Sequence, residues 1–334
     1  MTEILDLVTG VLNGKRLALA RLLTLVENNA PEGQVALDQL YTHTGHAHLI
    51  GVTGSPGAGK SSLVNQIALK MRQPSADRPA LTLAVVAVDP TSPFTGGAVL
   101  GDRVRMRDLA GDPGIFIRSM ATRGALGGLA RATANVVQVL DAAGFDVIMV
   151  ETVGAGQSEV DIARLAHTTL VIEAPGMGDD IQAIKAGILE IADILVINKA
   201  DYPGLESTVR ALRAMLELGH PTRHHDAQSA STPLWIPPVL QTVATRAEGI
   251  SELVNAIDDH ARHLRETGAW QIRDRIRLQS ELESLIQTEL TSQWRAKIPA
   301  GLYNQTLAEL ESRQISPLQA AKRLTQSHLV VLEE

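Results

Sequence analysis

The residue pattern with the clearest chemistry is GSPGAGKS at positions 54–61, a complete G-x-x-x-x-G-K-S motif. It follows an apolar run at 48–53 and precedes a helical pattern at 62–71, which is the strand–loop–helix context that the motif needs. Glycines let backbone N–H groups curl around a phosphate, and the start of the helix adds a favourable potential for an anion. We therefore expect a nucleotide phosphate site formed by Gly54, Ser55, Pro56, Gly57, Ala58, Gly59, Lys60, Ser61 and Ser62.

Two side chains at the end of this motif have tasks of their own. The Lys60 ammonium should reach the β- and γ-phosphates, which makes it a catalytic candidate, and the Ser61 hydroxyl should bind Mg²⁺. A glycine-rich turn without a ligand is the alternative for such a motif in isolation. The flanking strand and helix favour the phosphate site.

The choice of base depends on NKAD at positions 198–201, which closes another apolar run. Asp201 can accept hydrogen bonds from N1–H and N2–H₂ of guanine, whereas adenine presents a bare acceptor there and would leave the carboxylate unpaired. Asn198 can brace the neighbouring loop, and Lys199 completes the segment. A surface turn is the alternative for four residues taken alone. Their position at a strand end, after a phosphate loop, favours guanine binding.

A carboxylate also ends the apolar run at 146–151. Glu151, at the head of ETVGAGQ, can bind Mg²⁺ or its waters or position the attacking water, and the Gly154 N–H can contact the γ-phosphate. The alternative role for Glu151 is to cap the following helix. Ligand sites lie at the carboxyl ends of strands in open sheets, which favours the functional role and a catalytic assignment.

A second acidic segment covers DPTSPFTGG at 89–97 and LGDR at 100–103. Asp89 ends a further strand-like run on the ligand edge, and the glycines and prolines predict a loop that moves or lies against a ligand. Asp102 is either a second metal-facing carboxylate or the N-cap of a helix through 103–109. The expected metal ligands are therefore Ser61, Asp89, Asp102 and Glu151.

The composition of the 334 residues excludes several classes of protein. There is no cysteine, so disulfides, thiolate metal sites and cysteine nucleophiles are ruled out. The net charge is −7, whereas a general nucleic-acid binder carries a basic balance. The longest apolar run, at 81–88, is far shorter than the ~20 residues of a membrane span. The first residues, Met1-Thr2-Glu3, carry an acidic side chain, whereas the start of a signal peptide is basic. We expect a cytoplasmic protein that binds neither nucleic acid nor membrane.

Seven apolar runs are strand candidates, and helical patterns lie between most of them. Several runs are apolar throughout, which is typical of parallel strands buried on both faces. These features predict an α/β fold with a mostly parallel, doubly wound sheet. The runs cover residues 48–53, 81–89, 115–119, 146–151, 168–174, 194–198 and 238–244.

Helical patterns flank this region on both sides. We divide the chain into an N-terminal helical extension (1–47), a nucleotide-binding domain (48–265) and a C-terminal helical region (266–334). The C-terminal region holds Trp270 and Trp294, which we expect outside the α/β core, and a helix start at Ser316-Pro317. The helical ends either cap the sheet or form an arm against another subunit. Their amphipathic stripes are Leu19, Leu22, Leu23 and Val26, and Leu278, Leu282, Leu285 and Ile286.

Together these segments resemble the G protein chaperones of adenosylcobalamin-dependent acyl-CoA mutases. This is the MeaB, ArgK and methylmalonic aciduria type A family, within the G3E group of P-loop GTPases. The similar stretches run in family order through most of the chain, at 51–61, 88–106, 118–128, 150–159, 178–187 and 198–201. The longer ones, such as VDPTSPFTGGAVLGDRVRM at 88–106, are not shared by other P-loop proteins.

The resemblance implies a slow GTPase that binds GTP, GDP and Mg²⁺ and associates with a B12-dependent mutase. Such proteins gate the loading of adenosylcobalamin and protect or reactivate the mutase. It also implies that Asp89, Asp102 and Glu151 lie near Mg²⁺ and the switch loops. Lys185 matches a basic residue of a third mobile segment that transmits the nucleotide state, although from its sequence context alone it is a solvated helix lysine. The region 266–334 resembles the family's dimerisation arm, which implies a homodimer.

The base-binding loop departs from the family pattern. The guanine-contacting Ser-Ala loop falls at Val243-Ala244, so the hydrogen bond must come from a backbone N–H, which we expect at Ala244. Base affinity should then be weaker. No motif encodes the mutase partner: methylmalonyl-CoA mutase is the default, and isobutyryl- or 2-hydroxyisobutyryl-CoA mutase would be served by the same G-domain chemistry.

Three other functions compete with this one. A metal-insertion GTPase of the same group would hold its metal with Cys or His clusters, whereas the tight group here, His220, His224 and His225, is typical of a polar loop. An ArgK-type kinase or ATPase would use ATP, and NKAD argues against that base. A binding module without turnover would not hydrolyse GTP.

Overall fold

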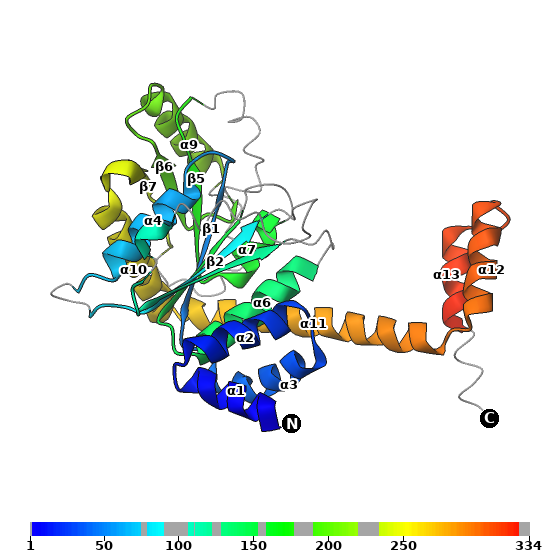
Figure 1. The fold of residues 1–334 in the computed structure, drawn as a ribbon. Coiled ribbons are helices and arrows are strands. Elements are labelled where there is room, and N and C mark those ends of the chain that lie inside the picture. Colours follow the sequence, from blue (N-terminus) through cyan, green and yellow to red (C-terminus); the bar gives the residue numbers. More distant parts are fainter. Residues whose placement is uncertain are drawn as a thin grey trace. The chain divides into compact units, whose positions relative to one another are not determined.

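The computed structural model describes residues 2–74, 79–89, 106–109, 111–121, 128–152, 158–176, 190–219 and 234–326. The chain forms two compact units, Met1–Asp274 and Arg275–Glu334. The first contains a sheet with helices on both faces (Figure 1), and the described part of the second contains helices only. No helix among these described residues is long and apolar enough to cross a membrane.

The sheet of the first unit is parallel throughout. Its seven strands lie in the order β3-β2-β4-β1-β5-β6-β7, and every neighbouring pair is parallel. This arrangement confirms the predicted α/β class and doubly wound sheet, and each predicted run contributes one strand. The bounds are β1 His48–Gly54, β2 Leu83–Asp89, β3 Ile115–Ala121, β4 Val147–Glu151, β5 Thr168–Glu173, β6 Ile194–Asn198 and β7 Val239–Thr242.

Burial on both faces explains why these strands are apolar in unbroken runs. In β6, Ile194 and Val196 belong to the core on one face of the sheet, while Leu195 and Ile197 belong to clusters on the other. All four side chains are fully buried, as expected for a parallel strand between two layers of helices.

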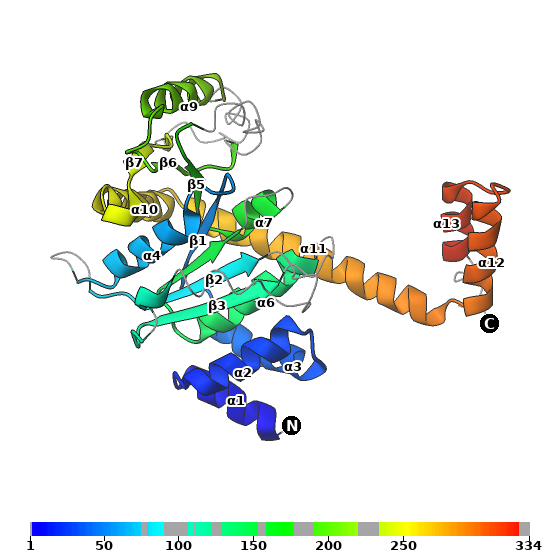
Figure 2. The same ribbon diagram turned by 45° about the horizontal axis from the view of Figure 1, so that its top comes forward.

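Different helices cover the two faces of the sheet (Figures 1 and 2). On one face lie α4 (Lys60–Met71) and α10 (Ile250–Glu266), which also pack against each other. On the other lie α6 (Gly128–Ala142), α7 (Ser158–Leu165) and α9 (Leu205–Gly219). Short 3₁₀ turns occur at Arg107–Leu109 (η2) and Ala244–Arg246 (η4).

The N-terminal helices extend the core on the α6 side. They are α1 (Thr2–Leu12), α2 (Arg16–Glu27) and α3 (Pro31–Leu40), followed by the turn η1 (Tyr41–His43), and α2 and α3 pack on α6. Arg118 of β3 forms an ion pair with Glu27 of α2, which ties this region to the edge strand. The N-terminal region therefore packs on the α6 side of the first unit. The predicted stripe of α2 is buried there: Leu19, Leu22, Leu23 and Val26.

The helix α11 (Ala269–Lys297) begins in the first unit and continues into the second. As expected, Trp270 lies outside the core clusters that contain the strands, in a small cluster with Ala261 and Leu264. Trp270 is 8% exposed and stacks on His167 with ring centroids 3.9 Å apart, because the first turn of α11 packs at the amino end of β5. The second unit also holds α12 (Ala300–Glu311) and α13 (Pro317–Gln326). As predicted, α13 starts at Pro317, and Ser316 and Gln319 cap it with reciprocal side-chain-to-backbone hydrogen bonds.

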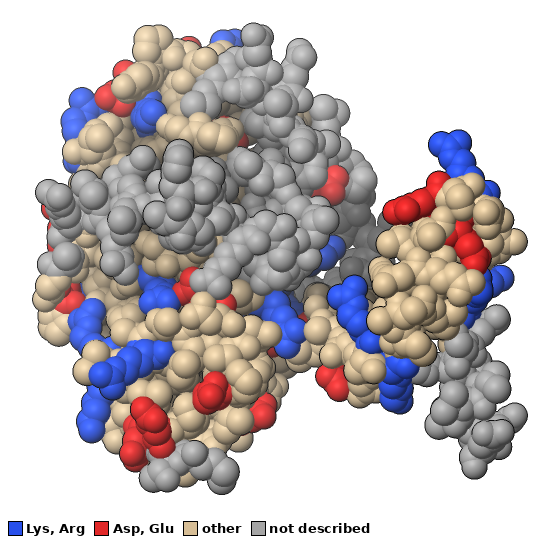
Figure 3. All heavy atoms as spheres, turned by 45° about the vertical axis from the view of Figure 1, so that its right-hand side comes forward, with Lys and Arg blue, Asp and Glu red and all other residues tan. Residues whose placement is uncertain are grey.

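The described surface carries mixed charge and one row of exposed apolar side chains. On the face drawn in Figure 3, described Lys and Arg side chains lie among described Asp and Glu side chains. Apolar side chains are exposed along α11, and such rows are typical of interaction surfaces. They belong to Ile272, Ile276, Leu278, Leu282, Leu285, Ile286 and Leu290.

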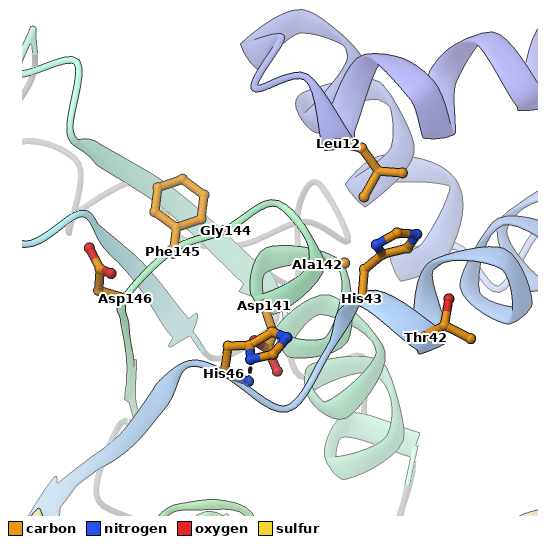
Figure 4. Close-up of a pocket in the computed structure, with 9 residues that line it drawn as sticks. All are labelled: Leu12, Thr42, His43, His46, Asp141, Ala142, Gly144, Phe145 and Asp146. Carbon is orange, nitrogen blue, oxygen red and sulfur yellow. Dashed lines mark hydrogen bonds between the residues drawn. The ribbon is translucent and has the colours of Figure 1, made fainter.

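A cavity of about 550 Å³ lies at the amino-end edge of the sheet, beside the connection from α6 to β4 (Figure 4). Its two carboxylates have structural partners: Asp141 accepts backbone N–H groups of residues 45–47, and Asp146 accepts the backbone N–H and the hydroxyl of Thr82. Parallel strands put the phosphate loop at the opposite edge. The lining residues are Leu12, Thr42, His43, His46, Asp141, Ala142, Gly144, Phe145 and Asp146.

Candidate nucleotide-binding site

The phosphate loop connects β1, whose last residue is Gly54, to α4, whose first residue is Lys60. At two positions of this loop, neighbouring segments lie too close for any side chain larger than that of glycine. Gly54 has φ +128°, and a Cβ there would lie 2.0 Å from the carbonyl oxygen of Ile172 in β5. Gly59 has φ +89°, and a Cβ there would lie 2.5 Å from Nδ2 of Asn198. The spacing of the motif thus reflects close approaches by β5 and by the end of β6.

Lys60 folds back over this loop. Its side chain is buried, and Nζ donates hydrogen bonds to the carbonyl oxygens of Gly54 at 2.9 Å and Ser55 at 3.0 Å. An ammonium held there lies near the backbone N–H groups at the start of α4, which attract an anion. This position suits the predicted role of Lys60 at the β- and γ-phosphates.

Ser61 and Glu151 meet at the carboxyl edge of the sheet. Oγ of Ser61 donates to Oε1 of Glu151 at 2.6 Å, and both residues are 6% exposed. The strand order explains the contact, since β4 lies beside β1 with Glu151 opposite Val52. Hydroxyl and carboxylate oxygens are ligands that Mg²⁺ accepts. The pair therefore fits the predicted metal site.

Several other predicted residues lie outside the described part of the site. Asp89 is the last residue of β2, the strand beside β4, so its backbone reaches the same edge of the sheet. The side chain of Asp89 lies outside the described residues, as do Asp102, Gly154 and Lys185. The same holds for the histidine group His220, His224 and His225.

Asn198 joins the phosphate loop to the base-binding segment. Its Nδ2 donates to the carbonyl oxygen of Ala58 at 2.8 Å, and its Oδ1 accepts the hydroxyl of Thr242 at 3.2 Å and the N–H of Ala244 at 3.1 Å. The side chain is 2% exposed. Asn198 thus braces two loops, and the following Lys199 turns the chain through a left-handed conformation with φ +58°.

The groups expected to contact guanine have partners within the protein. The Ala244 N–H bonds to Asn198, so a guanine carbonyl would have to share this donor. The Asp201 carboxylate is about one third exposed and lies 3.5 Å from Nη2 of Arg246. Arg246 is held from its other side by Glu248, 3.0 Å from its Nε. The carboxylate is therefore accessible, and a guanine base that binds it would also contact the half-exposed guanidinium of Arg246.

Sequence reasoning missed Glu173. It is the last residue of β5, is 4% exposed, and accepts a hydrogen bond from the Ser55 hydroxyl at 2.7 Å. The rule that ligand sites lie at the carboxyl ends of strands could have found it, because Glu173 falls near the end of the run at 168–174.

Over residues 19–298 the chain matches the sequence model of the family described as "Methylmalonyl Co-A mutase-associated GTPase MeaB". The chain belongs to this family. A relative from Pyrococcus abyssi, itself named a GTPase, is 44% identical over 316 residues, which are 95% of this chain and 94% of the relative. The GTPase ArgK of Escherichia coli is 37% identical over 323 residues, 94% of this chain and 93% of ArgK.

A solved structure supports the same assignment. The crystal structure of an LAO/AO transport system kinase aligns with 98% of both chains at a TM-score of 0.69 and 27% identity. As a member of the MeaB family, the present chain is a P-loop GTPase and binds guanine nucleotides. In the part of the chain that the structure describes, no cluster of three or more His, Asp or Glu side chains could hold a metal ion. A magnesium ion beside Ser61 and Glu151 would take its remaining ligands from the nucleotide, from water, or from Asp89 and Asp102, whose side chains lie outside the described residues.

Proposed function

We propose that this MeaB-family GTPase is a chaperone of an adenosylcobalamin-dependent acyl-CoA mutase. GTP hydrolysis would gate the loading of adenosylcobalamin and protect or reactivate the mutase. The observation that carries this proposal is the match of residues 19–298 to a GTPase family described by its association with methylmalonyl-CoA mutase. Methylmalonyl-CoA mutase is the first candidate partner, and isobutyryl- and 2-hydroxyisobutyryl-CoA mutases are the next.

The segments around the phosphates would change conformation according to whether GTP or GDP is bound. Lys60 would hold the β- and γ-phosphates, while Ser61 and Glu151 exchange their mutual hydrogen bond for contacts to Mg²⁺ or its waters. Bound GTP would order residues 89–102, 151–157 and 178–185. Loss of the γ-phosphate contacts on hydrolysis would release these segments, and the mutase would respond to that change.

We also propose that the protein is a homodimer that uses the exposed apolar row of α11. Leu282, Ile286 and Leu290 are 57%, 48% and 61% exposed, and their i, i+4 spacing puts them on one side of the helix. A second copy of the same helix offers a matching row. Leu282→Glu with Ile286→Glu should shift the molar mass in solution from dimer to monomer. Ser284→Glu, on the opposite side of the helix, is the matched control.

The chaperone proposal is tested by pull-down against the three candidate mutases, with the GTPase rate measured with and without each. We expect one mutase to associate and to raise the rate above an intrinsic value on the order of 10⁻⁴–10⁻² s⁻¹. The Lys60→Ala variant should lose the hydrolysis that accompanies binding. Lack of association with any of the three mutases would contradict the chaperone proposal and leave a GTPase with another client.

A further inference from the structure

A buried carboxylate lies directly beside the phosphate loop, and the hydrolytic scheme above does not use it. Glu173 ends β5, and its Oε2 accepts a 2.7 Å hydrogen bond from the hydroxyl of Ser55, the second residue of the loop. Only 4% of Glu173 is exposed to solvent. The hydroxyl of Ser55 donates to this carboxylate, and a hydrogen bond donated to it favours its ionised form. An ionised carboxylate buried next to a site for polyphosphate is electrostatically unfavourable for the ligand, so its presence there calls for a role.

Glu173 lies close enough to influence the phosphates. Nζ of Lys60, which should hold the β- and γ-phosphates, is 3.0 Å from the carbonyl oxygen of Ser55, and the hydroxyl of the same Ser55 contacts the carboxylate. Standard bond lengths then keep the carboxylate within roughly 13 Å of a phosphate oxygen on Lys60. β5 approaches the loop so closely at Gly54 that no Cβ would fit, and Glu173 is 4% exposed, so little solvent surrounds the carboxylate. Salt therefore screens the interaction weakly.

The expected size of this repulsion is large enough to measure. With an effective dielectric constant near 20, two unit charges about 10 Å apart repel by an amount equal to roughly a tenfold change in affinity. The phosphates of GDP and GTP each carry more than one negative charge, so the repulsion from Glu173 should be larger for GTP than for GDP. The charge of Lys60 offsets part of it.

We propose that Glu173 sets the affinity of the nucleotide site: its buried negative charge weakens the binding of GDP and GTP and speeds the release of GDP. The hydrogen bond from Ser55 holds the carboxylate in place against the loop. The proposal rests on the nucleotide site at residues 54–61. It makes Glu173 a residue that acts on the phosphates through the field at the loop, without touching them.

The test compares the full-length wild type with Glu173→Gln, which keeps the side-chain length and an acceptor oxygen for Ser55 but removes the charge. Affinities for guanosine, GDP and GTP, and the release rate of a fluorescent GDP analogue, are measured at fixed salt. We expect Glu173→Gln to bind GDP at least fivefold more tightly, mainly through slower release, and GTP more tightly still. Guanosine, which has no phosphate, should change by less than twofold.

Two further variants keep the proposal falsifiable. Glu173→Met is a second uncharged side chain of similar length with the same expected result, should the glutamine variant fail to fold. Ser55→Ala removes the hydrogen bond but keeps the charge, and should not tighten GDP binding. Unchanged or weaker GDP binding by folded, uncharged variants overturns the proposal, as does an equal change for guanosine. A wild-type chain that binds no GDP would instead contradict the nucleotide site itself.

Discussion

The hydroxyl of Ser61 donates a 2.6 Å hydrogen bond to Oε1 of Glu151, which joins the first turn of α4 to the end of β4. The two residues are 90 positions apart in sequence, and the pairing of β1 with β4 brings them together. Both groups carry oxygen atoms suited to Mg²⁺. The contact therefore marks where a metal ion and a terminal phosphate would be accommodated.

Two substitutions at this edge test which side chains GTP hydrolysis depends on. Lys60→Ala should abolish GTP hydrolysis, because it removes the charge that stabilises the β- and γ-phosphates. Glu151→Ala should reduce the rate strongly, by at least about a hundredfold, because it removes a ligand of the metal or of the attacking water. Phosphate release from GTP under single-turnover conditions measures both effects.

The control for these variants is Lys70→Ala, at the other end of the same helix α4. It should keep the wild-type rate. Turnover that is unchanged in both Lys60→Ala and Glu151→Ala would remove the assignment of this site as the hydrolytic centre.

Base selection is tested by Asp201→Asn. The carboxylate can accept from N1–H and N2–H₂ of guanine, and hydrogen bonds to a charged group contribute about 1.5–3 kcal/mol each. Asparagine keeps one acceptor oxygen for N1–H but presents an NH₂ group to the N2–H₂ donor, so GDP binding should weaken by about tenfold to a hundredfold. An amide at this position can instead donate to the 2-carbonyl oxygen of xanthine, so affinity for XDP should rise. Competition titrations of GDP, XDP and ADP measure the change, and retention of guanine preference by the variant would contradict the assigned role.

Much of the fold could be predicted because its strands are buried on both faces. A strand such as β6 needs apolar residues at every position, and that requirement is visible as an unbroken run in the sequence. The glycines of the phosphate loop are also visible locally. The reason for their spacing is not, because Gly54 and Gly59 are constrained by Ile172 and Asn198, which come from β5 and β6.

Contacts between distant segments are what the sequence could not supply. Glu173 becomes a neighbour of Ser55 only through the register of β5 on β1, so its position at a strand end indicates the ligand edge of the sheet but does not identify Ser55 as its partner. Trp270 belongs to a helical pattern, yet it packs on His167 because α11 starts beneath the amino end of β5. The engagement of the Ala244 N–H by Asn198 likewise depends on how two loops meet.

The first turns of α11 are held by an ion pair between the partly exposed Arg273 and the buried Asp193, which should matter for stability. Arg273 donates two 2.8 Å hydrogen bonds to Asp193, which is 4% exposed. Burial alone would raise the pKa of Asp193, but the hydrogen bonds and charge of Arg273 outweigh it and lower the pKa. Arg273→Ala leaves this carboxylate buried without its main partner and should cost about 3 kcal/mol in the free energy of unfolding. Urea denaturation followed by tryptophan fluorescence measures the loss.

The exposed pair of Arg262 and Asp259 provides the control for that experiment. Arg262→Ala removes a salt bridge between two largely solvated side chains and should change the free energy of unfolding by less than about 0.5 kcal/mol. Equal effects of Arg262→Ala and Arg273→Ala would show that burial of Asp193 does not control the stability of this region.

Stability should also fall in mild acid because of His48. Burial, and next the charge of His167, lower the pKa of His48 well below its usual value. Further positive groups that face it are Arg265, His260 and Arg273. In the unfolded chain His48 takes up a proton near pH 6.5, whereas in the folded chain it stays neutral at that pH. The unfolded state therefore binds more protons just below pH 6.5. The folded state is therefore favoured by this group above pH 6.5, and that advantage is lost as the pH falls.

Removing the titrating ring should flatten this part of the pH profile. His48→Gln keeps a polar group for the hydroxyl of Thr168, 2.8 Å from the histidine Nε2, but cannot take up a proton. Between pH 7 and 5.5, the wild type should lose about 1 kcal/mol more in the free energy of unfolding than this variant. His43→Gln, at an exposed histidine, should keep the wild-type acid sensitivity. Parallel profiles for the wild type and His48→Gln would mean that His48 takes up its proton equally in the folded and unfolded chains.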